Sequence, residues 1–140
     1  MPRVIRPAPP HLGTLARAAL AGRIWAAFVR ARILTRGGGL PNAVRRLGDD
    51  TRIPPYRIEP RRFGTIVARV LRVGPWRARC LWTTLVLYRL LRAQGDDAQV
   101  VIGLPLEPTD TEAHAWVEMA GEDVGPPPGR GRHQELARYP

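Results

Sequence analysis

One cysteine carries the most specific chemistry that this sequence offers. Cys80 is the only cysteine in 140 residues, and it stands where an arginine-bearing, turn-rich approach meets the apolar run CLWTTLVLYRLLRAQG. In the first turn of a helix its sulfur would lie near unpaired backbone N–H groups and the positive end of the helix dipole. Both favour the thiolate, as do the nearby Arg77 and Arg79. This placement suits a nucleophile; the alternative is a small core residue on an apolar helix.

A nucleophilic cysteine needs a base, and His114 is the candidate. Of the three histidines, His11 lies in a proline-rich arm and His133 in the tail, whereas His114 lies in the apolar segment AHAWVEM. A histidine in such surroundings is either a core residue bonded to backbone or the base for a cysteine at the start of an earlier helix. The spacing alone leaves both interpretations open.

Charge is distributed unevenly along the chain, in which all 22 basic residues are arginine. Residues 1–95 hold 19 arginines against three acids, whereas residues 96–140 hold three arginines against nine acids. A basic region of this size attracts nucleic acid, anionic lipid or an acidic peptide, or it forms a solvated arginine-rich face.

Composition also excludes several classes of protein. A single cysteine rules out an internal disulfide framework and fits a reducing cytosol. Arginines interrupt the longest apolar stretch, so we expect no membrane span and no secretory signal, and therefore a cytoplasmic protein. The three glycines at 37–39 lack a following Lys-Ser/Thr, and one cysteine with scattered histidines offers no metal site. We expect neither cofactor nor metal.

The elements that would position Cys80 and His114 follow from hydrophobic periodicity and from turn residues. After an extended arm at residues 1–10, apolar residues recur at three- and four-residue steps, and glycine or proline closes each segment. The predicted helices are residues 12–36, which end at the glycines 37–39, then residues 42–47, residues 60–73 and residues 80–94. The last of these is apolar around most of its circumference, which predicts a buried helix.

After Gly95 the period changes from helical spacing to two, which predicts strands. We expect strands over 98–104 and 113–119, a turn at AGED and a third strand from Val124, followed by a partly irregular tail. The pattern predicts an α+β fold with a helical N-terminal half. We divide the chain into an arm and helical region at residues 1–58 and a core at residues 59–140.

The runs CLWTTLVLYRLLRAQGDDAQVVIGL and AHAWVEMAGEDVG resemble the leader peptidases of lasso-peptide biosynthesis, bacterial enzymes of the transglutaminase-like cysteine protease superfamily. The shared pattern is Cys-Leu, an apolar helix ending in Leu-Leu-x-x-x-Gly, a strand ending in Ile-Gly, and His-Ala-Trp-Val-Glu followed by Gly. It covers residues 60–125. The resemblance implies a papain-like core, a buried helix packed on a small antiparallel sheet, with Cys80 as nucleophile and His114 as base.

The sequence departs from this family at the third catalytic position. The family has an aspartate twelve residues after the histidine, where this chain has Pro126. A hairpin turn centred near Gly121 predicts that Glu118 pairs with Glu122, Trp116 with Val124, and His114 with residue 126. A proline there cannot orient an imidazole.

Other groups must then orient His114, and we rank Glu112 first. It lies two positions away on the same strand face, about 7 Å at roughly 3.3 Å per residue, whereas Glu118 lies about 13 Å away. We expect Asp123 to project from the opposite face. A backbone carbonyl or a tail residue such as Gln134 comes next, and a bare Cys–His dyad last.

The resemblance implies a cysteine peptidase that removes the leader from a ribosomally made lasso-peptide precursor during maturation. Its implied partners are the precursor peptide, a separate small leader-binding protein and an asparagine-synthetase-like cyclase; we expect no nucleic-acid partner and leave peripheral membrane contact open. Two alternatives remain. One is a transglutaminase-like acyltransferase; the other is a non-catalytic basic module that binds nucleic acid or a membrane surface.

Overall fold

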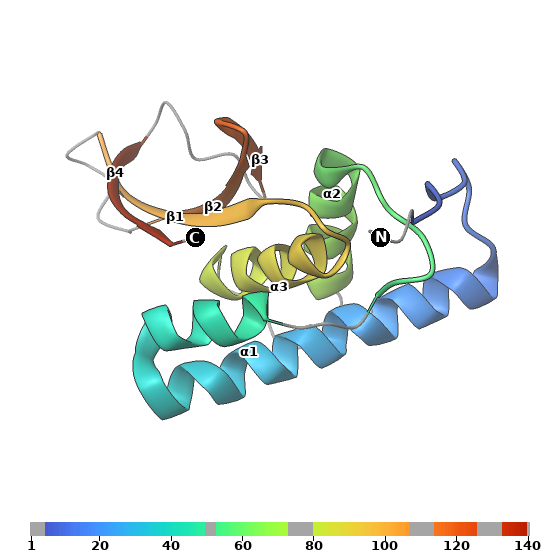
Figure 1. The fold of residues 1–140 in the computed structure, drawn as a ribbon, viewed down its shortest axis with the longest axis horizontal. Coiled ribbons are helices and arrows are strands. Elements are labelled where there is room, and N and C mark those ends of the chain that lie inside the picture. Colours follow the sequence, from blue (N-terminus) through green and yellow to red (C-terminus); the bar gives the residue numbers. More distant parts are fainter. Residues whose placement is uncertain (1–4, 50–52, 73–79, 107–113, 126–132, 140) are drawn as a thin grey trace.

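The computed structural model describes residues 5–49, 53–72, 80–106, 114–125 and 133–139. The elements in chain order are α1 (Thr14–Gly48), α2 (Pro60–Leu71), α3 (Cys80–Ala93), β1 (Ala98–Pro105), β2 (His114–Met119), β3 (Glu122–Gly125) and β4 (His133–Tyr139). Helix α3 packs on the sheet, and α1 and α2 pack on α3 (Figure 1). The predicted α+β architecture, a buried helix on a small antiparallel sheet, is confirmed.

Helix α1 contains the glycine-rich break that the sequence predicts, as a bend inside one long element. Gly39 has a φ of 77° and a ψ of 174°, which glycine adopts without strain, and Pro41 follows within the next turn. The predicted segments 12–36 and 42–47 therefore meet at this bend (Figure 1). Both contribute to the core through the buried side chains Leu20, Ile24, Ala27, Phe28, Ala31, Val44 and Leu47.

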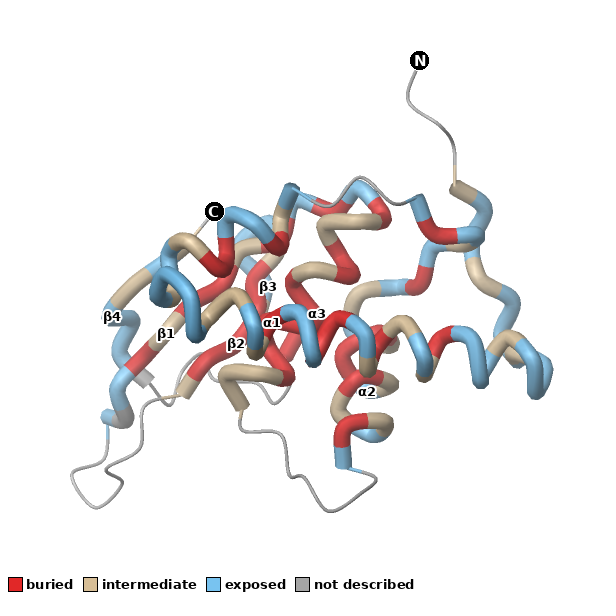
Figure 2. Tube along the Cα trace, turned by 90° about the horizontal axis from the view of Figure 1, so that it is seen from below, coloured by how far each residue is buried: buried red, intermediate tan, exposed pale blue. Residues whose placement is uncertain are grey.

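Helix α2 begins and helix α3 ends on local signals. Pro60 occupies the first turn of α2, and the Glu59 carboxylate accepts hydrogen bonds from the backbone N–H groups of Arg61 and Arg62 at 3.1 and 2.8 Å. Gly95, with a φ of 93°, follows α3. Eight of the fourteen residues of α3 are buried, which makes it the central helix of the fold (Figure 2).

Gln94 joins the segment before α2 to the end of α3. Its amide nitrogen donates to the Ile58 carbonyl at 2.7 Å, and its amide oxygen accepts from the Ile58 N–H at 3.0 Å. The same nitrogen donates to Asp96 at 2.6 Å, and Asp96 pairs with Arg57. One buried side chain thus satisfies both backbone groups of a residue more than thirty positions away.

The sheet has the strand order β3-β2-β1-β4, with every neighbouring pair antiparallel. The prediction of an irregular tail is wrong for residues 133–139, which form β4 against β1. The polar and charged composition of this segment gave no apolar alternation from which a strand could be predicted. An edge strand has little apolar surface to bury and often carries charges. The register of the β1–β4 pairing also shifts between Ile102 and Gly103, which interrupts the regular alternation of the two strand faces in β4.

The β2–β3 hairpin has a tighter turn than the sequence predicts. Ala120 and Gly121 have φ values of 50° and 78°, as in a two-residue turn of type I′. Glu118 therefore pairs with Asp123, and the predicted pairing of Glu118 with Glu122 is wrong. Because directly paired residues share a face, Asp123 lies on the Glu118 face instead of projecting from the opposite one.

A second irregularity shifts the hairpin again beyond the turn. Between Val117 and Glu118 the register slips, so that Val117 pairs with Gly125. The predicted pairing of Trp116 with Val124 is wrong for this reason. The predicted pairing of His114 with residue 126 falls outside the described residues.

Candidate active site

Cys80 and His114 come together where α3 begins and β2 begins. Cys80 is the first residue of α3, and His114 is the first residue of β2, opposite Gly103 of β1. In the described part of the hairpin, β3 pairs with β2 only as far as Val117. Before that point in β2, Ala115 is contacted by Cys80 and Thr84 of α3.

The Cys80 sulfur is held by one side chain and two backbone groups. A hydrogen bond with the His114 imidazole lowers the pKa of the partly buried thiol, and partial burial opposes this effect. Backbone hydrogen bonds from Ala115 and Leu81 and the charge of His114 lower the pKa further. The balance favours the thiolate, because these groups stabilise negative charge on sulfur more than burial disfavours it.

Thr84 fixes the distance between the two elements that carry the pair. Its hydroxyl donates a buried hydrogen bond to the Ala115 carbonyl at 2.9 Å. Thr84 lies one helical turn after Cys80 and on the same side of α3, and Ala115 directly follows His114. The bond therefore ties the helix that carries Cys80 to the strand that carries His114.

A second set of contacts supports His114 from its own strand. The His114 ring stacks with Trp116, with ring centroids 6.1 Å apart and an interplanar angle of 25°. The Trp116 indole N–H donates to the Glu118 carboxylate at 2.9 Å, and Arg138 of β4 contacts the same carboxylate at 3.4 Å. Trp116 and Glu118 are only 2% and 3% exposed, so both side chains are packed in the interior.

Gly103 leaves the room that the Trp116 ring occupies. A Cβ at this position would lie 2.7 and 2.8 Å from the Cη2 and Cζ3 atoms of Trp116 and 2.9 Å from the Gln134 carbonyl oxygen. No side chain fits there without displacing the indole or the neighbouring strand. Close packing beside the candidate site thereby explains the glycine at position 103 of β1.

Of the residues predicted to orient His114, Gln134 lies within the described part of the chain. Glu112 and Pro126 lie outside it. Gln134 pairs with Leu104, the neighbour of Gly103, so the register places it on the face opposite His114 and does not favour it in this role. Glu135 pairs with Gly103 and shares the His114 face, where it bonds Arg138 at 2.9 and 3.0 Å.

The remaining histidines lie elsewhere. His11 is exposed before α1, and His133 is the first residue of β4.

Within the ranges that the structure covers, no group of three or more His, Cys, Asp or Glu residues is arranged to hold a metal ion. Across those same ranges, none of the helices has the length and apolarity to cross a membrane.

Sequence reasoning missed the two contacts that set the geometry of this site. Thr84 lies on a helix whose sequence is largely apolar. Its partner is a backbone carbonyl, and a contact with a backbone group cannot be predicted from residue types. The link from Trp116 to Glu118 had a usable signal: alternate residues of a strand share a face, and the two are two positions apart.

Comparison with known proteins gives one family. The family model described as "Transglutaminase-like superfamily" matches residues 24–138, which include all of α2, α3 and β1–β3 and most of α1 and β4. No curated protein and no solved structure matches the chain.

Proposed function

The chain belongs to the transglutaminase-like superfamily, and we propose that it is a cysteine peptidase that removes the leader from a ribosomally made lasso-peptide precursor. One observation carries the enzymatic part of this proposal. The thiol of Cys80, at the N-terminus of α3, is hydrogen-bonded to His114 and has a lowered pKa. A thiolate paired with an imidazole is the activated nucleophile of acyl-transfer chemistry.

The reaction proceeds through an acyl-enzyme. The Cys80 thiolate forms a bond to the scissile carbonyl carbon, and backbone N–H groups of the first turn of α3 stabilise the oxyanion. The C–N bond then breaks as His114 transfers a proton to the leaving amine. Water attacks the thioester, His114 accepts its proton, and the carboxylic acid and the thiolate are released.

The assignment to lasso-peptide maturation is supported by residues that surround this pair. The motifs from Cys-Leu to His-Ala-Trp-Val-Glu resemble those of the leader peptidases, and they fall on α3, β1 and β2. Within the proposal, a separate small protein presents the leader and an asparagine-synthetase-like cyclase uses the freed core peptide. We retain Glu112 as the group that orients His114.

A reconstituted cleavage assay tests this function. The chain is incubated with a lasso-peptide precursor and a leader-binding protein, and the products are identified by mass spectrometry. Wild-type protein is expected to release leader and core, whereas Cys80→Ala and His114→Ala are expected to lose at least about a thousandfold in rate. Arg46→Gln, an exposed change on α1, serves as the control.

Two results would contradict the proposal. Equal cleavage by Cys80→Ala and wild type would show that Cys80 is not the nucleophile. Transfer of the acyl group to an added labelled amine, in place of hydrolysis, would instead favour an acyltransferase, which the same acyl-enzyme permits.

A further inference from the structure

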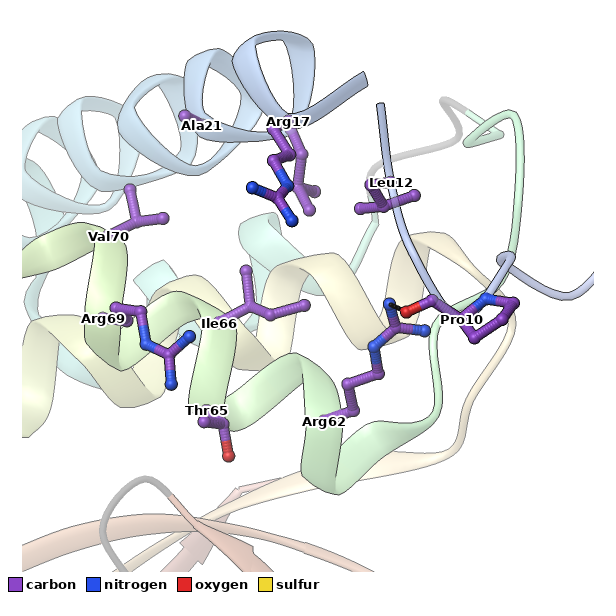
Figure 3. A pocket seen from close by; sticks show the side chains of 10 residues that line it. Pro10, Leu12, Arg17, Ala21, Arg62, Thr65, Ile66, Arg69 and Val70 are labelled. Atoms are coloured by element: carbon purple, nitrogen blue, oxygen red, sulfur yellow. Dashed lines mark hydrogen bonds between the residues drawn. The ribbon is translucent and has the colours of Figure 1, made fainter. Parts of the chain in front are cut away.

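A groove lies between α1, α2 and the N-terminal arm (Figure 3). It has a volume of about 590 Å³, within the range of roughly 300–1,000 Å³ that is usual for ligand sites. Its lining residues are Pro10, Leu12, Arg17, Leu20, Ala21, Arg62, Thr65, Ile66, Arg69 and Val70. None of these residues belongs to the Cys80–His114 site.

The groove combines an aliphatic floor with a cationic rim. Ala21 of α1 faces Ile66 and Val70 of α2, and Leu12, just before α1, lies at one end (Figure 3). Leu20 of α1 also lines the groove. Three guanidinium groups, from Arg17, Arg62 and Arg69, surround this floor. A ligand that satisfies both must carry aliphatic groups and negative charge together.

One of the three rim arginines already binds a peptide backbone. Arg62 donates to the carbonyl oxygens of Pro9 and Pro10 at 3.1 and 3.0 Å. An extended segment of polypeptide is thus accommodated at this end of the groove. Arg17 and Arg69 are exposed, and among the described residues no ion pair with an acid involves either of them.

The segments that line the groove carry little negative charge of their own, and Glu122 of β3, which reaches α2, pairs with Arg61. The described residues from 5 to 72 contain 13 arginines and only two acids, Asp49 and Glu59. The Glu59 carboxylate is engaged at the N-terminus of α2. A complementary partner must therefore bring carboxylates of its own.

The shape of the groove favours a peptide over nucleic acid or lipid. No aromatic side chain lines it, so it offers no platform on which a base could stack. Its floor is recessed, with Leu20 only 3% exposed, whereas interfacial binding to a bilayer requires apolar side chains that protrude. Aliphatic side chains flanked by carboxylates fit both parts of the groove.

We propose that this groove binds a short segment of a partner protein in which aliphatic side chains alternate with Asp or Glu. The aliphatic side chains fill the floor, and the carboxylates pair with Arg17 and Arg69. The groove is then a docking site separate from the bond-breaking site, and its ligand is retained on the protein without being cleaved.

The test begins with selection of peptides from a random phage-displayed library on the full-length protein. A fluorescent synthetic copy of the selected peptide is then titrated by anisotropy. We expect selected peptides rich in Asp or Glu and Leu or Ile. The combined change Arg17→Gln and Arg69→Gln should weaken binding about tenfold or more, and Arg17→Lys with Arg69→Lys should retain part of it.

Controls separate this site from general attraction to a basic protein. Arg36→Gln with Arg46→Gln removes the same charge from exposed positions of α1 outside the groove and should leave affinity within about twofold. Vesicles of phosphatidylserine and phosphatidylcholine, and a labelled single-stranded oligonucleotide, are titrated in parallel. We expect neither to displace the peptide.

Three outcomes would overturn the proposal. They are the absence of acidic peptides from the selection, equal binding of the selected peptide by the Arg17→Gln, Arg69→Gln protein, and displacement of the peptide by vesicles or by the oligonucleotide. The measurement is of binding alone, so its failure leaves the proposed cleavage at Cys80 untouched.

Discussion

Thr84 and Ala115 are joined by a buried hydrogen bond of 2.9 Å that crosses from α3 to β2. Thr84 lies one helical turn after Cys80, and Ala115 directly follows His114. Ala115 also contributes a backbone hydrogen bond to the Cys80 sulfur. Ala115 thus contacts both Thr84 of α3 and the Cys80 sulfur, and these two contacts constrain the separation between the sulfur and the His114 imidazole.

Removal of the Thr84 hydroxyl tests this arrangement. Thr84→Val keeps the shape but leaves the buried Ala115 carbonyl without its donor, so we expect the free energy of unfolding to fall by about 1–3 kcal/mol. Turnover in the cleavage assay should fall about tenfold or more, because the pair is less well positioned. Thr84→Ser restores the hydroxyl and should recover most of both. Unchanged turnover in Thr84→Val would show that this bond does not position the pair.

The lowered pKa of Cys80 predicts a pH-dependent reactivity that His114 controls. Iodoacetamide reacts with the thiolate, and the chain has one cysteine, so the mass increase reports Cys80 alone. Because the hydrogen bond with His114 lowers the pKa, its loss in His114→Ala raises it. The midpoint of the alkylation rate should therefore move to higher pH, and the rate at neutral pH should fall. His11→Ala, in the exposed arm, should reproduce the wild-type profile, and an identical profile in His114→Ala would contradict the proposed pairing.

Gly103 predicts a steric effect at the same end of the sheet. In Gly103→Ala the new Cβ meets the Trp116 ring and the Gln134 carbonyl oxygen at less than 3.0 Å. We expect a loss of about 1–3 kcal/mol in unfolding free energy by urea denaturation, together with lower turnover as Trp116 shifts against His114. Gly22→Ala is the matched control, since nothing lies within 4 Å of its added Cβ on α1. It should stabilise the protein by roughly 0.5–1 kcal/mol. Equal stability of the two variants would contradict the close packing.

Glu112 is the orienting acid that the sequence favours. If its carboxylate accepts a hydrogen bond from the His114 ring, Glu112→Gln removes the charge that stabilises the imidazolium and should lower turnover about tenfold or more. Glu122→Gln, an exposed change on β3, provides a control of equal charge. An unchanged rate in Glu112→Gln would exclude it and direct attention to Glu135, which shares the His114 face.

The elements around the site could be predicted because their signals are local. Pro60 and Gly95 are found at the ends of helices, and β1 and β2 fall in the segments whose two-residue period predicts strands. The placement of Cys80 and His114 on α3 and β2 followed from these signals. Their contact did not, because it depends on how α3 packs against the edge of β2.

What could not be predicted depends on residues that meet only in the folded chain. Strand β4 lacks a clear apolar face, and it becomes a strand by pairing with β1. The hairpin register was wrong because Ala120 adopts a positive φ, which its residue type does not indicate, and because a bulge follows at Val117. The third catalytic group stays a prediction.

The pairing of Gln94 with Ile58 has a mechanical consequence. The side-chain amide of Gln94 makes the same pair of hydrogen bonds with Ile58 that a backbone residue makes in a β-bridge. These bonds connect the N-terminal half of the chain to the C-terminal end of α3. The two halves cannot swing apart about the segment before α2 without exposing an amide and a peptide group that are both dehydrated. Heat or pulling force should therefore disrupt the molecule as one block, with no stage at which the sheet survives alone.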